Sequence, residues 1–255
     1  MNGTLYRLEA LRLLRTHTLL LLVLAFTASG AVGPLLAHYM EDLLRLADPE
    51  GELAAMDLQL PTMTAGDALG SHIELIAPLG VLLVVLVAAM ALTVDSSPGR
   101  AVFYRSRVPG TARLILPRVV LPALAAVLAH LVGALVAWAF TAMFFGGPPL
   151  PATMFGALLG GLYMVFVVAV VALASSLVRN ALAVVGVAVL VLVLCAGVGS
   201  LPLLSEWAPG ALLQGVVLPA VGASLGDLLP AIATTVVLTV GALVLALNRS
   251  AAREV

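Results

Sequence analysis

The sequence predicts an all-α integral membrane protein, with a single transmembrane domain over residues 1–255. Hydrophobic residues make up 62% of the chain and charged residues only 10%. A soluble domain of this length carries about 25% charged residues, so most of this surface must face lipid. Six apolar stretches are each long enough to cross a hydrocarbon core of about 30 Å. With six spans, eleven of the twelve arginines fall on one side of the membrane.

The elements follow from the N-terminus. Residues 1–17 form a basic helix ahead of the membrane, with Tyr6, Ala10, Leu13 and Leu14 on one face and the arginines on another. An amphipathic helix in the headgroup layer and a plain basic flank explain this segment equally well. A cleavable signal peptide is disfavoured, because the apolar stretch that follows is too long. The spans are placed at 18–37, 75–94, 119–140, 154–177, 181–201 and 229–247.

Arginine placement predicts the orientation. Eleven arginines precede span one, lie in the loops after spans two and four, or follow span six, and only Arg45 lies on the other side. The positive-inside rule makes the arginine-rich side cytoplasmic, so both termini are expected in the cytoplasm.

The external loop at 38–74 is acidic. Thr64 and Asp67 resemble the N-cap signature of a helix leading into span two. His38 and His72 lie near Glu41 and Glu74 in sequence, so a metal site is conceivable, but a solvated acidic face explains them better.

The cytoplasmic loop after span two contains a helix start signal, Ser97-Pro98. A short basic helix with two aromatic residues is expected there, and it looks like a docking surface for a partner. Arginines that merely stop translocation, with aromatics anchored at the interface, are the alternative. The residues assigned to docking are Pro98, Gly99, Arg100, Phe103, Tyr104 and Arg105.

Residues 201–228 are too apolar for a free loop and too interrupted by proline and glycine for a span. Short helices dipping into the outer leaflet would fit, if protein covers their backbone. Trp207 is placed like an interfacial anchor.

The sequence lacks the residues that several kinds of catalysis require. The chain has no lysine, which excludes a P-loop and a lysine Schiff base. The one cysteine, Cys195, is expected to pack as a buried thiol. Among acidic and basic residues, His130 is the one placed inside a span, and a hydrogen bond to a neighbouring helix is favoured over a ligand role. No cofactor and no catalytic or metal-binding residue is assigned.

This layout resembles the permease subunit of type-2 ATP-binding-cassette exporters over the whole chain. Locally, Asp95–Gly99 and the following 105–113 are similar to the family's motif of an acidic residue and glycine, then Ser-x-Pro-x-x-Arg, with one residue inserted before Pro109. Residues 174–180 resemble the family's end of span four.

The resemblance implies an exporter half that pairs with a second permease, identical or related, and with two separate ATPase subunits that bind ATP and Mg²⁺. The segment around Pro98 and Phe103 would be the coupling helix, and the broken hairpin with Trp207 and Gln214 the extracellular gate. The chain itself is then not an enzyme, has no nucleic-acid partner, and lies in the plasma membrane. Abundant Ala, Val, Leu and Arg with no Lys is typical of a GC-rich bacterium, so a bacterial source is expected. The substrate would be an amphiphilic small molecule, an antibiotic, a peptide or a lipid.

Two other classes of protein stay open. A membrane scaffold or assembly factor would share the topology without an ATPase partner. A membrane-embedded enzyme would use a metal held by His38 and His72.

Overall fold

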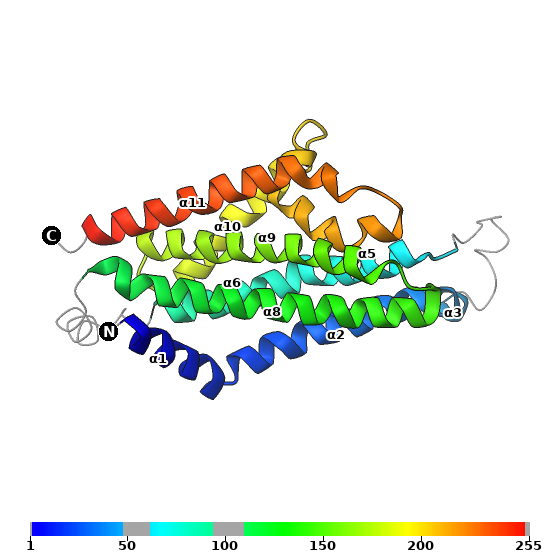
Figure 1. Cartoon of the computed structure of the whole chain (residues 1–255), viewed down its shortest axis with the longest axis horizontal. Coiled ribbons are helices and arrows are strands. Elements are labelled where there is room, and N and C mark those ends of the chain that lie inside the picture. The colour runs from blue at the N-terminus through cyan, green and yellow to red at the C-terminus, as the bar shows by residue number, and fades with distance from the viewer. Residues whose placement is uncertain (1, 48–61, 94–109, 253–255) are drawn as a thin grey trace.

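The chain folds into a bundle of long helices (Figure 1). The computed structural model describes residues 2–47, 62–93 and 110–252. The long helices are α2 (Thr18–His38), α8 (Thr111–Phe145), α9 (Leu150–Leu177), α10 (Ala181–Gly199) and α11 (Leu229–Ala252). The shorter ones are α1 (Asn2–Arg15), α3 (Met40–Ala47), α5 (Ala65–Leu75), the π-helical turn η1 (Ile76–Gly80), α6 (Val81–Leu92) and four 3₁₀ segments, η3 (Ser205–Trp207), η4 (Pro209–Val216), η5 (Leu218–Ala220) and η6 (Leu225–Leu228).

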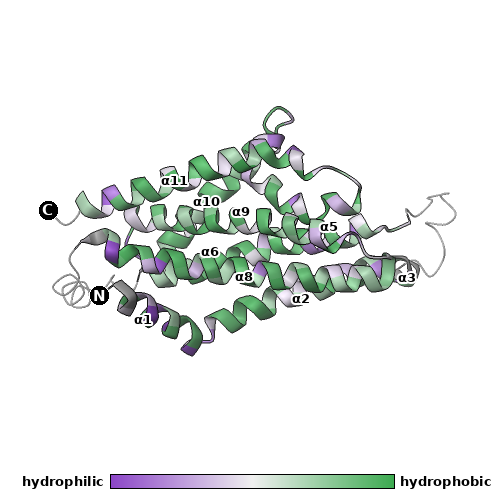
Figure 2. Ribbon diagram, viewed as in Figure 1, coloured by the Kyte–Doolittle hydropathy of each residue, from purple (hydrophilic) through white to green (hydrophobic). Residues whose placement is uncertain are grey.

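Six helical segments are long and apolar enough to cross a membrane, and the described residues contain no strand. This confirms an all-α, multi-pass membrane protein. Figure 2 shows hydrophobic residues along most of each span and hydrophilic ones gathered near the ends. The second span begins well before the predicted residue 75, since α5, η1 and α6 run on as one rod over Ala65–Leu92.

The capping signature at the start of that rod is confirmed. The Thr64 hydroxyl accepts a bond from the Asp67 amide at 3.3 Å, and the Asp67 carboxylate accepts one from the Thr64 amide at 2.8 Å. This reciprocal pair satisfies two backbone donors at the helix N-terminus, which is why the helix begins there.

Close packing of the spans depends on glycine. Helix α9 is the most buried span, and it is packed against α8, α11, α6 and η4. Helix α2 packs along α8, where a Cβ added to Gly133 would lie 2.6 Å from the Phe26 carbonyl oxygen. Gly30 of α2 meets the backbone of Gly133 in the same way. Small residues let helix backbones approach closely, which is the main packing device inside lipid.

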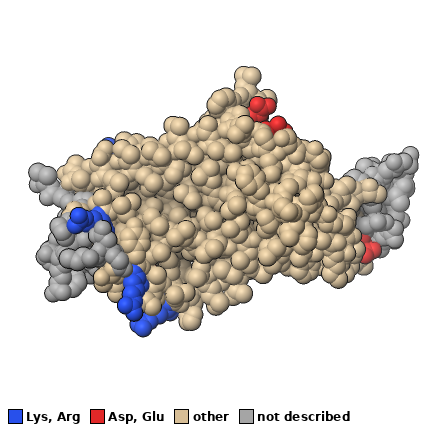
Figure 3. All heavy atoms as spheres, in the orientation of Figure 1, with Lys and Arg blue, Asp and Glu red and all other residues tan. Residues whose placement is uncertain are grey.

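The two ends of the bundle differ in charge. Both chain termini lie at the same end, where α1 also lies and where α6 ends and α8 begins (Figure 1). Basic side chains are seen at this end in Figure 3, and acidic ones are seen elsewhere on the molecule. We call it the arginine end, defined by α1, Arg113, Arg118, Arg179 and Arg249, and the other the opposite end.

Candidate functional site

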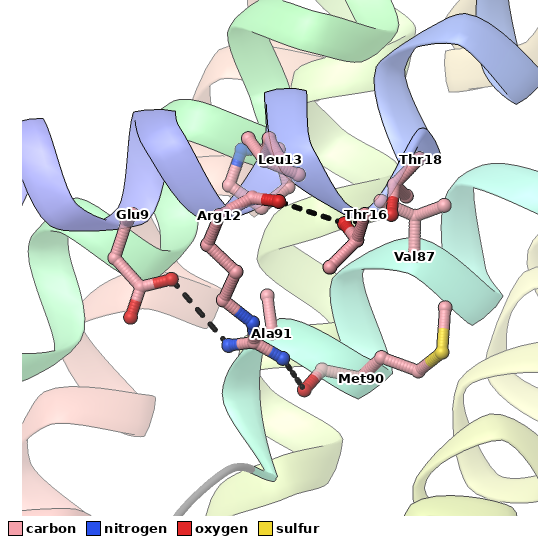
Figure 4. A pocket seen from close by; sticks show the side chains of 9 residues that line it. Glu9, Arg12, Leu13, Thr16, Thr18, Val87, Met90 and Ala91 are labelled. Atoms are coloured by element: carbon pink, nitrogen blue, oxygen red, sulfur yellow. Dashed lines mark hydrogen bonds and ion pairs between the residues drawn. The ribbon is translucent and has the colours of Figure 1, made fainter.

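An ionic cluster of Glu9, Arg12 and Arg118 docks α1 onto the bundle at the arginine end, and Figure 4 shows Glu9 and Arg12 of this cluster. The Glu9 carboxylate accepts a bond from Arg118 Nε at 3.2 Å and another from Arg12 Nη1 at 3.4 Å. The Arg118 side chain is 4% exposed and that of Glu9 is 15% exposed, whereas Arg12 is 37% exposed. A nearly buried guanidinium requires a charged partner, and Glu9 supplies it from a helix 109 residues away in sequence.

The same cluster reaches the end of α6. Arg12 Nη2 donates to the carbonyl oxygen of Met90 at 3.3 Å, in the last turn of that helix (Figure 4). The last four carbonyls of an α-helix have no partner within the helix, and the C-terminus carries a partial negative charge. An arginine side chain is well suited to this position.

Glu9, Arg12 and Arg118 therefore join α1 to both helices that flank residues 94–109. Glu9 and Arg12 line a small cleft of about 100 Å³ together with residues of α2, α6 and α8, and Arg118 forms an ion pair with Glu9. Apart from Glu9 and Arg12, the polar side chains that line the cleft are Thr16 and Thr18. The Thr16 hydroxyl already donates to the Arg12 carbonyl, so the contacts observed here connect α1 to the bundle.

The apolar face predicted for α1 does not pack on the bundle as a unit. Tyr6, Ala10 and Leu13 are half-buried, but Leu14 is 58% exposed, and Arg12, expected on another face, donates to α6. The reason is that α1 docks against protein through Glu9 and Arg12, so polar contacts, and not hydrophobicity alone, set its rotation.

The corner between α1 and α2 is made by two residues. His17 has a φ of 55° and is the one non-glycine residue with positive φ in the described ranges. The Thr16 hydroxyl donates to the Arg12 carbonyl at 2.8 Å, which closes the end of α1. The chain thus turns sharply from α1 into the first span.

The residues predicted for ATPase coupling lie outside the described ranges: Pro98, Gly99, Arg100, Phe103, Tyr104 and Arg105. The described residues on either side of them are Thr93, which follows α6, and Gly110, which precedes α8. The end of α6 and the start of α8 both lie at the arginine end, and Arg12 bonds to the last turn of α6.

The interrupted segment before the last span does fold as short 3₁₀ helices, as predicted. Segment η4 packs on α9, where Gly156 and Gly215 touch backbone to backbone. Leu212, Leu213 and Val216 of η4 are buried. The protein thus covers the irregular backbone of η4, as a segment that dips into the membrane requires.

Trp207 and Gln214, predicted as a gate, line two neighbouring cavities. Trp207 is 52% exposed and lines a cavity of about 310 Å³ with residues of α10 and α11. Gln214 lines a cavity of about 300 Å³ between α9 and α10. Cys195 borders both cavities. It packs against the hydrophobic core as expected, but it is half-buried and not fully buried.

The histidines considered for a metal are in different surroundings. His38 is exposed and stacks on Phe144, with ring centroids 4.3 Å apart. His72 is buried, and its Nδ1 lies 3.4 Å from the hydroxyl oxygen of Ser29. Ser29 precedes His38 by nine residues on the same helix, or about 13 Å of helix rise, so the two histidines lie at different positions along α2. Within the described residues, no group of three or more metal-ligating side chains occurs.

His130 is fully buried, but the expected hydrogen bond to a neighbouring helix is not found within the described residues. Its ring meets the ring of Phe26 edge-on, with centroids 6.1 Å apart, and lies against Gly160 of α9. These neighbours are an aromatic ring and a glycine, neither of which has a polar side chain to bond to the imidazole.

Glu9 is the functional residue that sequence reasoning missed. The available signal was an acidic residue alone among three arginines in a short basic segment. Its partner Arg118 could not be identified, because the contact joins segments far apart in sequence.

No protein-family model, curated protein or solved structure matches this chain. The fold and the ionic cluster are therefore the basis for the function proposed next.

Proposed function

We propose that the chain is the transmembrane subunit of an ATP-driven exporter, which pairs with a second permease and takes its energy from separate ATPase subunits. The arginine end is cytoplasmic in this proposal, and the membrane is the plasma membrane of a bacterium. The cargo is an amphiphilic small molecule, an antibiotic, a peptide or a lipid.

The observation that carries the proposal is the ionic cluster at the arginine end. Glu9, Arg12 and Arg118 tie α1 to the last turn of α6 and to the first turns of α8, the two helices that flank residues 94–109. If an ATPase binds those residues, a force on them passes into both helices, and α1 moves with them. A rigid connection of this kind is useful where work is delivered from outside the membrane.

The opposite end supports the proposal in a second way. The interrupted segment η3–η6 lies between the last two spans, and it lines, together with α10, two cavities of about 300 Å³ and 310 Å³. A segment of short helices with space beside it can shift more easily than a continuous span. Trp207 and Gln214, one in each cavity, are the residues we assign to an outer gate.

The test is to purify the chain gently from its native host and identify the proteins that accompany it. We expect a soluble ATPase in stoichiometric amount, and we expect it to be lost when Phe103 and Tyr104 are both replaced by alanine. A matched control is Phe155→Ala, because Phe155 is 53% exposed on a span and lies outside the segment proposed for coupling.

Recovery of the chain without an ATPase, under conditions that preserve other membrane complexes, would overturn the exporter proposal. A membrane scaffold or assembly factor would then be the better account. An ATPase that stays bound to the double variant would leave the exporter standing but remove Phe103 and Tyr104 from the docking surface.

A further inference from the structure

An open cavity of about 410 Å³ lies on the outer surface of the bundle between α2 and the rod formed by α5, η1 and α6. Leu79 and Val32 line it and are 60% and 42% exposed, so its mouth opens away from the protein interior. Both walls belong to spans, so the cavity faces the hydrocarbon of the bilayer. A molecule that enters it must come from the membrane.

The wall on the α6 side is shaped by the π-helical turn η1, which runs over Ile76–Gly80 and contains Pro78. Proline lacks an amide N–H, so the regular α-helical bonding cannot continue through it. Single π-turns of this kind occur frequently at functional sites. Ile76, Leu79 and Gly80 of the turn all line the cavity.

Glycine at position 80 lets the inner wall form. A Cβ added to Gly80 would lie 3.0 Å from the Phe26 ring. Phe26 is 1% exposed and is itself part of the lining. The cavity is therefore backed by a fixed aromatic side chain.

Ser29 is the polar side chain of the lining, and it is half-buried. Its hydroxyl donates to the Phe26 carbonyl oxygen at 2.9 Å, and its oxygen lies 3.4 Å from His72 Nδ1. A serine hydroxyl has one proton and two lone pairs. We assign the proton to the bond with Phe26, so His72 Nδ1–H donates to Ser29 Oγ and one lone pair of that oxygen is left to accept a further bond.

We propose that this cavity binds an uncharged amphiphile from the bilayer, with a long apolar body and a hydroxyl group that donates to Ser29 Oγ. The lining has no charged side chain, so a charged group held there would have no counter-charge. A hydrocarbon chain matches the rest of the wall. This inference concerns binding by the chain alone and does not rest on the exporter proposal.

The experiment uses the full chain in phosphatidylcholine nanodiscs and a photoactivatable diazirine derivative of 1-hexadecanol. After illumination, the labelled residues are mapped by mass spectrometry. We expect adducts on residues 25–32 and 75–83, and competition by 1-hexadecanol but not by hexadecane. Ser29→Ala should weaken labelling about threefold to tenfold, which corresponds to the loss of one hydrogen bond.

A second pair of variants tests the space itself. Ala28 is exposed and lines the cavity, so Ala28→Phe should fill it and abolish the labelling. Leu24 is 58% exposed on the same helix and does not line the cavity, so Leu24→Phe should leave the labelling unchanged.

Labelling spread evenly over the exposed faces of the spans would overturn the inference. Equal competition by hexadecane, with no effect of Ser29→Ala, would also overturn it, because the cavity would then be a nonspecific slot for acyl chains. Adducts that appear only when copies of the chain are kept apart would mean that a second copy covers the cavity.

Discussion

The ion pair between Glu9 and Arg118 is expected to stabilise the protein far more than the pair between Glu9 and Arg12. Both pairs share the same carboxylate, and their distances are similar, 3.2 Å and 3.4 Å. The difference is burial, because Arg118 is 4% exposed and Arg12 is 37% exposed. Water screens the second pair and not the first.

The expected magnitudes follow from that difference. A buried hydrogen bond between charged groups contributes about 1.5–3 kcal/mol. An i,i+3 pair on a helix surface contributes about 0.2–0.5 kcal/mol. We therefore expect the coupling energy of Glu9 with Arg118 to be at least three times its coupling energy with Arg12.

The assay is a pair of double-mutant cycles measured by reversible unfolding in mixed detergent micelles. One cycle uses Glu9→Gln and Arg118→Gln, and the other uses Glu9→Gln and Arg12→Gln, with Arg15→Gln as the control because Arg15 is an exposed arginine of the same helix. A cycle isolates the pairwise energy from the other effects of each substitution. Equal coupling in both cycles, or coupling below about 0.5 kcal/mol for Arg118, would refute the argument from burial.

Three further predictions concern single positions. Gly160→Ala would place a Cβ 2.5 Å from His130 Nε2, so we expect the unfolding free energy to fall by about 1–3 kcal/mol. The double variant with His130→Ala should recover much of this loss. An equal loss in the single and double variants would contradict the contact. Because φ is 55° at His17, His17→Val should lower the unfolding free energy by about 1–2 kcal/mol, whereas His17→Gly should leave it unchanged. Thermal unfolding in detergent measures both, and equal effects of the two substitutions would contradict the positive φ. Thr64→Ala should lower the unfolding free energy by about 1 kcal/mol and speed hydrogen exchange of the Asp67 amide. Unchanged exchange at Asp67 would argue against the capping box.

The spans could be predicted from the sequence because length and hydropathy are local properties. The start of α2 at Thr18 and the end of α9 at Leu177 agree with the prediction to the residue. The capping box at Thr64 and Asp67 was also readable, since its parts are three residues apart. The break before the last span was visible in its prolines and glycines.

The contacts between spans could not be predicted. Sequence shows many small residues, but it does not show that Gly30 meets Gly133 or that Gly156 meets Gly215. The rotation of α1 was misjudged for the same reason, because Arg12 is held by a carbonyl of Met90, 78 residues further on. Hydrophobic periodicity describes a helix alone, whereas these contacts depend on its neighbours.

The measurement that tests the central claim most directly is the mass of the intact complex, extracted from the native membrane and analysed by native mass spectrometry. We expect two copies of this chain, or one copy with a related permease, together with two ATPase subunits. A chain that is extracted intact, alone or only with itself, and without any ATPase would contradict the account.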